Sequence, residues 1–111
     1  MANGIFQIFT DKAGEFRFRL RAANNEIVLG SEGYTSKSSC KNGIDSVKEN
    51  APKNERYKRK TSKNGEPYFN LVAGNGEIIG VSEMYSSEQA RDNGIEAVKD
   101  AAPQASVEDQ T

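Results

Sequence analysis

A basic run near the middle of the chain holds the residues best suited to binding chemistry. Between Lys53 and Lys63, lysine and arginine side chains greatly outnumber the single acidic residue, Glu55. Cationic side chains neutralise phosphates and an interleaved aromatic ring can stack on a base, so the run is typical of weak nucleic-acid binding. The candidate residues are Arg56, Tyr57, Lys58, Arg59 and Lys60.

Three further arginines, Arg17, Arg19 and Arg21, point to one face of a predicted strand. If this face lies beside the basic run, the two segments form a cationic stripe, and Tyr68 supplies a second ring for stacking. The alternative is a solvated strand whose charges keep a sheet edge from pairing with other chains. The sequence favours this alternative and keeps nucleic acid as the second interpretation.

A short polar motif, Ser-Glu-x-Tyr, occurs twice. One interpretation is a paired ligand site whose halves are related by an internal twofold axis. The other is structural: serine and glutamate bond to backbone groups before a helix, and tyrosine packs over its first turn. We favour the structural interpretation. The residues concerned are Ser31, Glu32, Tyr34, Ser82, Glu83 and Tyr85.

Groups that perform catalysis or hold metals are scarce. The sequence has no histidine and one cysteine, Cys40, so the usual general base near neutral pH is missing and no imidazole can activate the thiol. Without histidine or clustered carboxylates, no ligand set for zinc or calcium is apparent. We therefore predict no catalytic residue, no metal and no cofactor.

The segments that position these residues are duplicated along the chain. Phe18 and Phe69 lie 51 positions apart, and the same offset carries the whole of 12–52 onto 63–103 without a gap, with about half of the paired residues identical. Shared residues should serve the fold, whereas unshared ones are free to serve a particular role. The basic residues at 56–59 replace mainly uncharged residues at 5–8, so the fold does not require them.

Each copy is predicted to form three strands followed by a helix. The clearest strand holds Phe18 and Leu20 alternating with arginines, a period of two that indicates one buried face. Gly14 and Gly65 predict a hairpin turn after the first strand of each copy. The predicted strands span 5–10, 16–22 and 26–31 in copy one, and 56–61, 67–73 and 77–82 in copy two.

Apolar residues at helical spacing follow each third strand. Ser36 and Ser87 are predicted to cap the helices, because a serine hydroxyl can accept a hydrogen bond from an amide of the first turn. A glycine inside each helix predicts close approach to the sheet, although the helix could instead break at its Asn-Gly pair. Pro52 and Pro103 are predicted to stop the two helices.

The chain has 111 residues, the size of one domain, and each copy is near the lower limit for a core of its own. We therefore predict one domain over 1–111, with repeat 1 at 4–52, repeat 2 at 53–103, and a C-terminal strand or frayed tail at 104–111. The predicted fold class is α+β: one antiparallel sheet from both copies, with two helices packed on one face and pseudo-twofold symmetry. The expected state is a monomer with an internal pseudo-dimer.

Three pairs of segments carry a family resemblance: 14–18 with 68–71, the two Ser-Glu-x-Tyr motifs, and 42–48 with 93–99. Taken in order, they resemble the YegP-like family of small bacterial proteins, also called DUF1508 or UPF0339. The resemblance implies two tandem β3-α-β repeats with exchanged C-terminal strands, so that 55–60 would belong to both repeats and 105–109 would form a strand. It implies no activity and brings no catalytic residues.

Composition narrows the function further. The net charge of −1 leaves no overall basic footprint for nucleic acid. No segment has the roughly 18 apolar residues of a membrane helix, and the N-terminus lacks a secretory signal, so we expect a cytoplasmic protein that does not bind membranes. We predict a non-enzymatic binding or assembly module with an unknown protein or small-molecule partner. Weak nucleic-acid binding through 53–63 is the alternative.

Overall fold

Both copies of the repeat form the same series of elements in the computed structural model, which describes residues 4–111. Copy one forms β1 (Ile5–Thr10), β2 (Phe16–Arg21), β3 (Ile27–Gly30) and α1 (Lys37–Asn50). Copy two forms β4 (Tyr57–Thr61), β5 (Pro67–Val72), β6 (Ile78–Val81) and α2 (Glu88–Ala101). Two 3-10 turns, η1 (Asn54–Arg56) and η2 (Ala102–Gln104), follow the helices, and the last strand is β7 (Ser106–Asp109).

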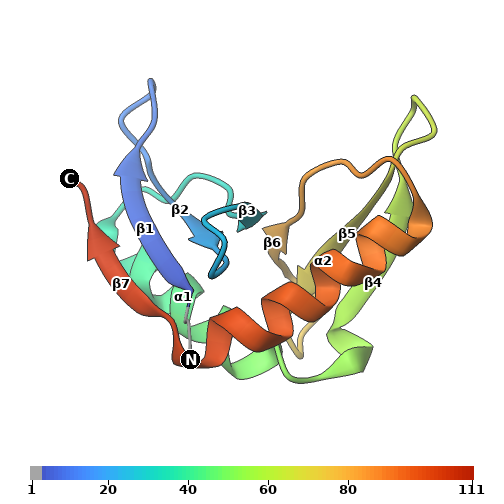
Figure 1. Ribbon diagram of the computed structural model, residues 1–111. Helices are drawn as coiled ribbons and strands as arrows, with labels where there is room; N and C mark the ends of the chain where they lie inside the picture. Colours follow the sequence, from blue (N-terminus) through green and yellow to red (C-terminus); the bar gives the residue numbers. More distant parts are fainter. Residues whose placement is uncertain (1–3) are drawn as a thin grey trace.

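The strands join into one seven-stranded sheet in the order β4-β5-β6-β3-β2-β1-β7. Each copy contributes an antiparallel meander, and the two meanders meet where β3 pairs with β6 through Gly30 and Val81. The helices pack on one face, and β4 and β7 lie at opposite ends of the molecule (Figure 1). The predicted α+β class is confirmed.

The internal symmetry extends to the packing of the aromatic rings. Phe6 meets Phe18 with ring centroids 5.7 Å apart, and the counterparts Tyr57 and Phe69 are also 5.7 Å apart. The registers agree as well, since Ile8 pairs with Phe18 as Arg59 pairs with Phe69. Each residue of one copy can therefore be compared directly with its counterpart 51 positions away.

One apolar core joins the two copies. Side chains from β2, β5 and both helices belong to the same buried cluster. Phe18 and Leu20 are almost completely buried, as are Phe69 and Leu71 in copy two, while Arg17, Arg19 and Arg21, which alternate with them, stay partly exposed. The period-two prediction for the second strand of the chain is confirmed.

Serine caps begin both helices, as predicted. The Ser36 hydroxyl accepts a hydrogen bond from the amide of Ser39 at 3.1 Å, and the Ser87 hydroxyl accepts one from the amide of Ala90 at 3.0 Å. Each helix then runs for 14 residues without a break at Asn-Gly. The alternative of a broken helix is therefore wrong, because the buried face on both sides of the glycine holds the helix against the sheet.

At the central junction of the sheet, a large side chain of one copy contacts a glycine of the other. Leu29 and Gly80 are counterparts in the two copies, and Leu29 is fully buried. A Cβ atom added to Gly80 would lie 2.7 Å from Cγ of Leu29. The absence of a side chain at 80 therefore makes the space that Leu29 fills.

The last strand crosses to the other copy. β7 pairs with β1 of copy one, which confirms the exchange of the C-terminal strand. The pairing is parallel, in contrast to the other named strand pairs of residues 4–111, because α2 returns the chain to the first edge before β7 begins. In copy one the chain leaves α1 through η1 and enters β4 directly. Among the described strands β4, which follows α1, pairs with β5 of copy two alone, so this strand also lies with the other copy.

The helices of the described residues are shorter than a membrane-spanning helix. Within residues 4–111, no helix is both long enough and apolar enough to span a bilayer. Each of the two has 14 residues, whereas a spanning helix needs about 20.

Candidate functional site

The basic run lies at one end of the sheet. β4 is an edge strand, and Lys58, Arg59 and Lys60 on it are exposed. Arg56 lies just before the strand, in η1, where its Nε donates to Oδ1 of Asn50 at 2.8 Å. The structure thus concentrates three cationic side chains on a single edge strand.

The backbone of β4 is open along this edge. The amide of Ser62 donates to the carbonyl of Glu66 at 2.8 Å, which sets the phase of the hydrogen-bonded pairs between β4 and β5. Because such pairs alternate, Lys58 and Lys60 bond inward, and the N–H and C=O groups of Arg59 and Thr61 point outward. No other described strand covers that side of β4. These outward groups form a template for a further strand.

The equivalent edge of copy one is occupied. β7 lies along β1, and the amide of Gln110 donates to the carbonyl of Ile8, the counterpart of Arg59, at 2.8 Å. Two side-chain contacts reinforce the pairing: Gln7 Nε2 donates to Glu108 Oε1 at 2.8 Å, and Lys37 Nζ donates to Asp109 Oδ2 at 2.8 Å. The pairing of β7 with β1 is therefore a template for the pairing of a further strand with β4.

Acid should loosen β7. The hydrogen bond from Lys37, together with those from Thr111, lowers the pKa of the Asp109 carboxyl from its ordinary value. A carboxyl with a lowered folded-state pKa contributes stability above its unfolded pKa, near 4, and loses that contribution as the pH falls through the folded value. We expect the amide protection factor of Gln110, measured by hydrogen exchange, to fall below about pH 4. Asp109→Asn should show a low protection factor already at pH 7, and a protection factor that is the same in both proteins at every pH would contradict this role.

The helix beside β4 gives the edge a mixed charge. Arg59 Nε donates to Oδ1 of Asp92 on α2 at 2.9 Å, and the partly buried Arg91 contacts the same oxygen at 3.1 Å. The hydrogen bond from Arg59 is the main cause of the lowered pKa of Asp92. Among the ion pairs of residues 4–111, none involves Lys58 or Lys60. These two lysines remain the uncompensated cations of the edge.

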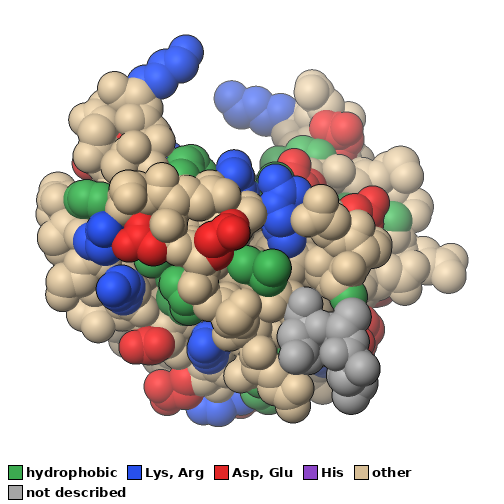
Figure 2. Space-filling model, turned by 60° about the vertical axis from the view of Figure 1, so that its left-hand side comes forward, with side chains coloured by type: hydrophobic (Ala, Val, Ile, Leu, Met, Phe, Trp, Pro, Cys, Tyr) green, Lys and Arg blue, Asp and Glu red, His purple; other side chains and the backbone are tan. Residues whose placement is uncertain are grey.

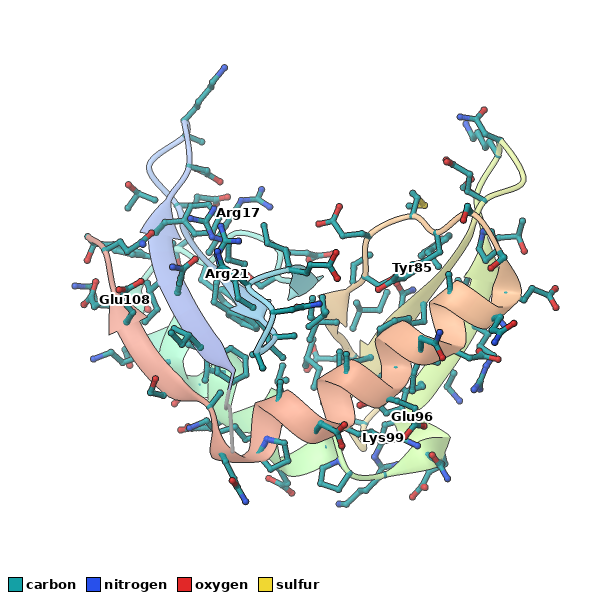
Figure 3. All side chains as sticks on the ribbon, viewed as in Figure 1. Arg17, Arg21, Tyr85, Glu96, Lys99 and Glu108 are labelled. Atoms are coloured by element: carbon teal, nitrogen blue, oxygen red, sulfur yellow. The ribbon has the colours of Figure 1, made fainter. Side chains whose placement is uncertain are left out.

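The arginines of β2 are not brought to the basic run. Four strand spacings separate β2 from β4, roughly 19 Å. The Arg17 guanidinium pairs with Asp11 at 2.7 Å, and the Nε atoms of Arg19 and Arg21 both donate to Gln7 Oε1 at 2.8 Å. Figure 3 shows Arg17 and Arg21 in the half that carries β2, away from Glu96 and Lys99 of α2. The cationic stripe considered from the sequence does not form.

Tyr57 cannot stack on a base. Its ring is 5% exposed and packs in the core, and its hydroxyl donates to the carbonyl of Ala51 at 2.7 Å. Burial raises the pKa of this phenol. The counterpart of Tyr57 is Phe6, a core residue, and this relation in the sequence indicates the buried role. Tyr68, opposite Lys60 on β5, is half-buried.

The face that includes β1 and β7 carries both signs of charge (Figure 2). Figure 2 shows Lys and Arg side chains interspersed with Asp and Glu on this face. This distribution agrees with the near-zero net charge and contains no broad cationic field on that face. The edge of β4 is therefore a local feature.

The serines of the Ser-Glu-x-Tyr motifs are structural. The hydroxyl of Ser31 accepts a hydrogen bond from the amide of Phe18 at 2.9 Å and donates to the carbonyl of Glu32 at 2.8 Å. Ser82 repeats both contacts, with the amide of Phe69 at 2.9 Å and the carbonyl of Glu83 at 2.8 Å. Each hydroxyl thus supports the strand that precedes the helix.

The tyrosines of the motifs pack between sheet and helix. Tyr34 stacks on Phe18 with centroids 6.3 Å apart, and Tyr85 stacks on Phe69 at 6.5 Å. Burial is the main cause of the raised pKa of both phenols. The Tyr85 hydroxyl lies where a Cβ atom of Gly94 would be, so tyrosine and glycine fit each other.

An open groove of roughly 770 Å³ lies between the β2–β3 turn and α2. Of the six motif residues, Glu83 and Tyr85 line it, so this groove draws on the second motif alone. Arg21 of β2 and Glu26 of the turn bring opposite charges to the same groove. The lining offers mixed polarity and contains no cysteine, serine, threonine or lysine.

Cys40 belongs to the core. Its side chain is fully buried on α1, and burial is the main cause of the raised pKa of its thiol. A protonated, enclosed thiol is a poor nucleophile. Among residues 4–111, no group of three or more His, Cys, Asp or Glu side chains is arranged to hold a metal ion.

These features define a class: a small α+β protein built from a tandem repeat, with a single sheet whose two end strands are covered differently. The chain belongs to the DUF1508 family, described as a domain of unknown function, whose family model matches residues 11–57 and 62–109. The double match agrees with the duplication.

Similar proteins carry names that state no activity. A UPF0339 protein in the ptx operon 5' region of Stutzerimonas stutzeri is 55% identical over 105 residues, which are 95% of each chain. The UPF0339 protein YegP of Escherichia coli K12 is 47% identical over 108 residues, 97% of this chain and 98% of YegP. Relatives of this family thus have no established function.

Solved structures support the fold. The solution structure of YegP from E. coli matches with a TM-score of 0.94 at 46% identity, over 100% of this chain and 96% of that one. The solution structure of a UPF0339 protein from Shewanella oneidensis matches with a TM-score of 0.90 at 45% identity, over 96% of this chain and 91% of that one. The recognition of a YegP-like tandem repeat is confirmed.

Proposed function

We propose that this protein is a non-enzymatic binding module that takes an extended polypeptide strand on the open edge of β4. One observation carries the proposal: β1 is covered by β7, whereas the equivalent side of β4 is uncovered among the described strands. Strand addition uses main-chain hydrogen bonds for affinity and alternate side chains for specificity. The outward groups of Arg59 and Thr61 supply the first of these requirements.

The charges on β4 favour a foreign strand over a second β4. Two antiparallel copies of this strand would bring Lys58, Arg59 and Lys60 against the same three cations. Natural proteins use such charges to prevent edge-to-edge aggregation. An acidic partner meets no such repulsion, so the same residues that keep the protein from self-pairing can select a partner.

The chemistry of the remaining residues supports a role without catalysis. The sequence has no histidine, and its one thiol is buried with a raised pKa. An unpaired buried cysteine is also in keeping with a reducing compartment, so a cytoplasmic location is part of the proposal.

Weak nucleic-acid binding is the second candidate, and the exposure of Lys58 and Lys60 is the observation in its favour. Phosphate contacts need only cations, but a stacking platform also needs an exposed ring. Tyr57 is buried and the β2 arginines lie in the other half, which leaves few additional groups for an oligonucleotide.

Two variants of one residue separate the candidates. Arg59→Ala and Arg59→Pro remove the same guanidinium, but only proline also removes the outward N–H, at an edge position where the ladder to β5 does not use it. The probes are linear peptides selected from a displayed random octapeptide library with the wild-type protein. We expect Arg59→Pro to weaken peptide binding at least about tenfold relative to Arg59→Ala, measured by fluorescence anisotropy.

A nucleic-acid binder would behave differently. Labelled single-stranded RNA, titrated at two salt concentrations, would then bind with steep salt dependence and be weakened equally by both substitutions. That result, or a failure of the library to yield any binding peptide, would overturn strand addition. Thermal unfolding confirms that each variant is folded, and Thr61→Pro, which removes the next outward N–H, replaces Arg59→Pro if that variant is not.

A further inference from the structure

We infer that the strand accepted by β4 runs parallel to it, with acidic side chains on one face and a cationic side chain on the other. This inference rests on the proposed function and specifies the partner. It is drawn from β7, which occupies the equivalent position on β1, and from the residues that differ between the two edges. The charged side chains of the chain's own β7 are complementary to one face of β4 and not to the other.

The register of β7 on β1 supplies the template. Val107 pairs with Phe6 and Glu108 with Gln7, so successive residues of β7 point to opposite faces of the sheet. Val107 and Asp109 line a small hollow with Ile44 of α1, which places them on the helix face. Glu108 therefore lies on the face away from the helices, where it accepts the hydrogen bond from Gln7.

On the face away from the helices, the edge strand itself gains two lysines at β4, whereas the arginines of the neighbouring strand in copy one are replaced by Tyr68, Asn70 and Val72. Lys58 stands where Gln7 contacts Glu108, and Lys60 is the counterpart of Phe9. Neither lysine takes part in an ion pair of residues 4–111. A glutamate at the position of Glu108 would thus exchange a neutral amide partner for an ammonium group. This face selects acidic residues.

On the helix face, by contrast, two lysines of copy one are replaced by acidic residues in copy two. Lys37, which binds Asp109 at 2.8 Å, is replaced in copy two by Glu88. Lys41, which lines the same hollow as Asp109, is replaced by Asp92. An aspartate at the position of Asp109 would therefore meet carboxylates, whereas a lysine or arginine there would meet a complementary charge.

The two arginines on this face, Arg59 and Arg91, do not restore the balance. Arg59 is already bound to Asp92 at 2.9 Å, and Arg91 shares the same carboxylate. Within residues 4–111, Glu88 is in no ion pair, so its charge is left for the incoming strand. Like charges against a wrong partner are a common source of specificity. The edge thus rejects the C-terminal strand of a second copy and accepts a foreign one.

Two peptides that differ at one residue test the pattern. The first copies Gln104–Thr111 of this chain, and the second is the same peptide with Asp109→Lys, both blocked at their ends. We expect the lysine peptide to bind the wild-type protein about five- to tenfold more tightly, as one exchanged partly exposed charge contact allows. Perturbation of the amide NMR signals of Arg59 and Thr61, rather than of Ile8, localises binding to β4.

A charge reversal in the protein provides the matched control. Glu88→Lys recreates the charge found at Lys37, so the preference should invert and the aspartate peptide should bind more tightly. Lys58→Glu should weaken both peptides, because both retain the glutamate of the other face. Equal binding of the two peptides, or tighter binding of the aspartate peptide to the wild type, would overturn the charge pattern while leaving strand addition in place. If neither peptide perturbs β4, the pattern inferred for the partner is wrong, and the library selection decides separately whether strands are bound at all.

Discussion

Phe69→Ala should lower the free energy of unfolding by about 3–5 kcal/mol. Phe69 is fully buried on β5, and its ring packs between those of Tyr57 and Tyr85 at centroid distances of 5.7 and 6.5 Å. Truncation removes the contacts of the ring and leaves a cavity between two aromatic neighbours that are held by other contacts. A domain of this size has a total stability of about 5–15 kcal/mol, so the variant should lose a large share of its stability.

Urea denaturation provides the measurement, with an unchanged slope indicating an unchanged two-state transition. Tyr68→Ala is the matched control, since Tyr68 immediately precedes Phe69 on β5, is half-buried, and points to the other face. It should cost about 1 kcal/mol or less. A loss from Phe69→Ala no larger than that of the control would show that the aromatic column is not central to the core.

Gly94→Ala should also destabilise the protein, although alanine is the better helix former. A Cβ at this position collides with the Tyr85 hydroxyl and lies 2.6 Å from Cζ of the same ring. Overpacking costs about 1–3 kcal/mol, against which the helix propensity of alanine returns about 1 kcal/mol. We expect a net loss of up to about 2 kcal/mol in urea denaturation.

The effect of Gly94→Ala on stability should change from destabilising to stabilising when the ring of Tyr85 is removed. In a Tyr85→Ala background, Gly94→Ala should stabilise the protein by about 0.5–1 kcal/mol, because only the propensity difference remains. Gly43→Ala is an internal replicate, since its Cβ would meet Tyr34 in the same way. A substitution that destabilises equally in both backgrounds would mean that the glycine is needed for a reason other than the tyrosine.

Local patterns predicted the elements because their causes are local. Alternation around Phe18 and the cap at Ser36 depend on neighbours in the sequence, and both are confirmed. The duplication added a longer-range constraint, since two copies too small for separate cores had to share one. The repeat boundaries at 4–52 and 53–103 stay predictions.

The spatial relation of the charged segments could not be predicted in the same way. Whether Arg17 lies near Lys58 depends on strand order, and β3 and β6 join the copies so that these residues fall in different halves. The roles of Lys37 and Glu88 were also missed. The sequence shows that these two counterparts carry opposite charges. The significance of that difference becomes clear only when β7 is placed beside β1.

The contact between Leu29 and Gly80 has a consequence for the history and assembly of the chain. A homodimer of single repeats would place the same residue at both positions of this junction, either two leucines in a space for one or two glycines around a void. With leucine in one copy and glycine in the other, each half is complementary to the other at this junction. At this junction, neither half therefore carries the residue that pairing with its own copy would require.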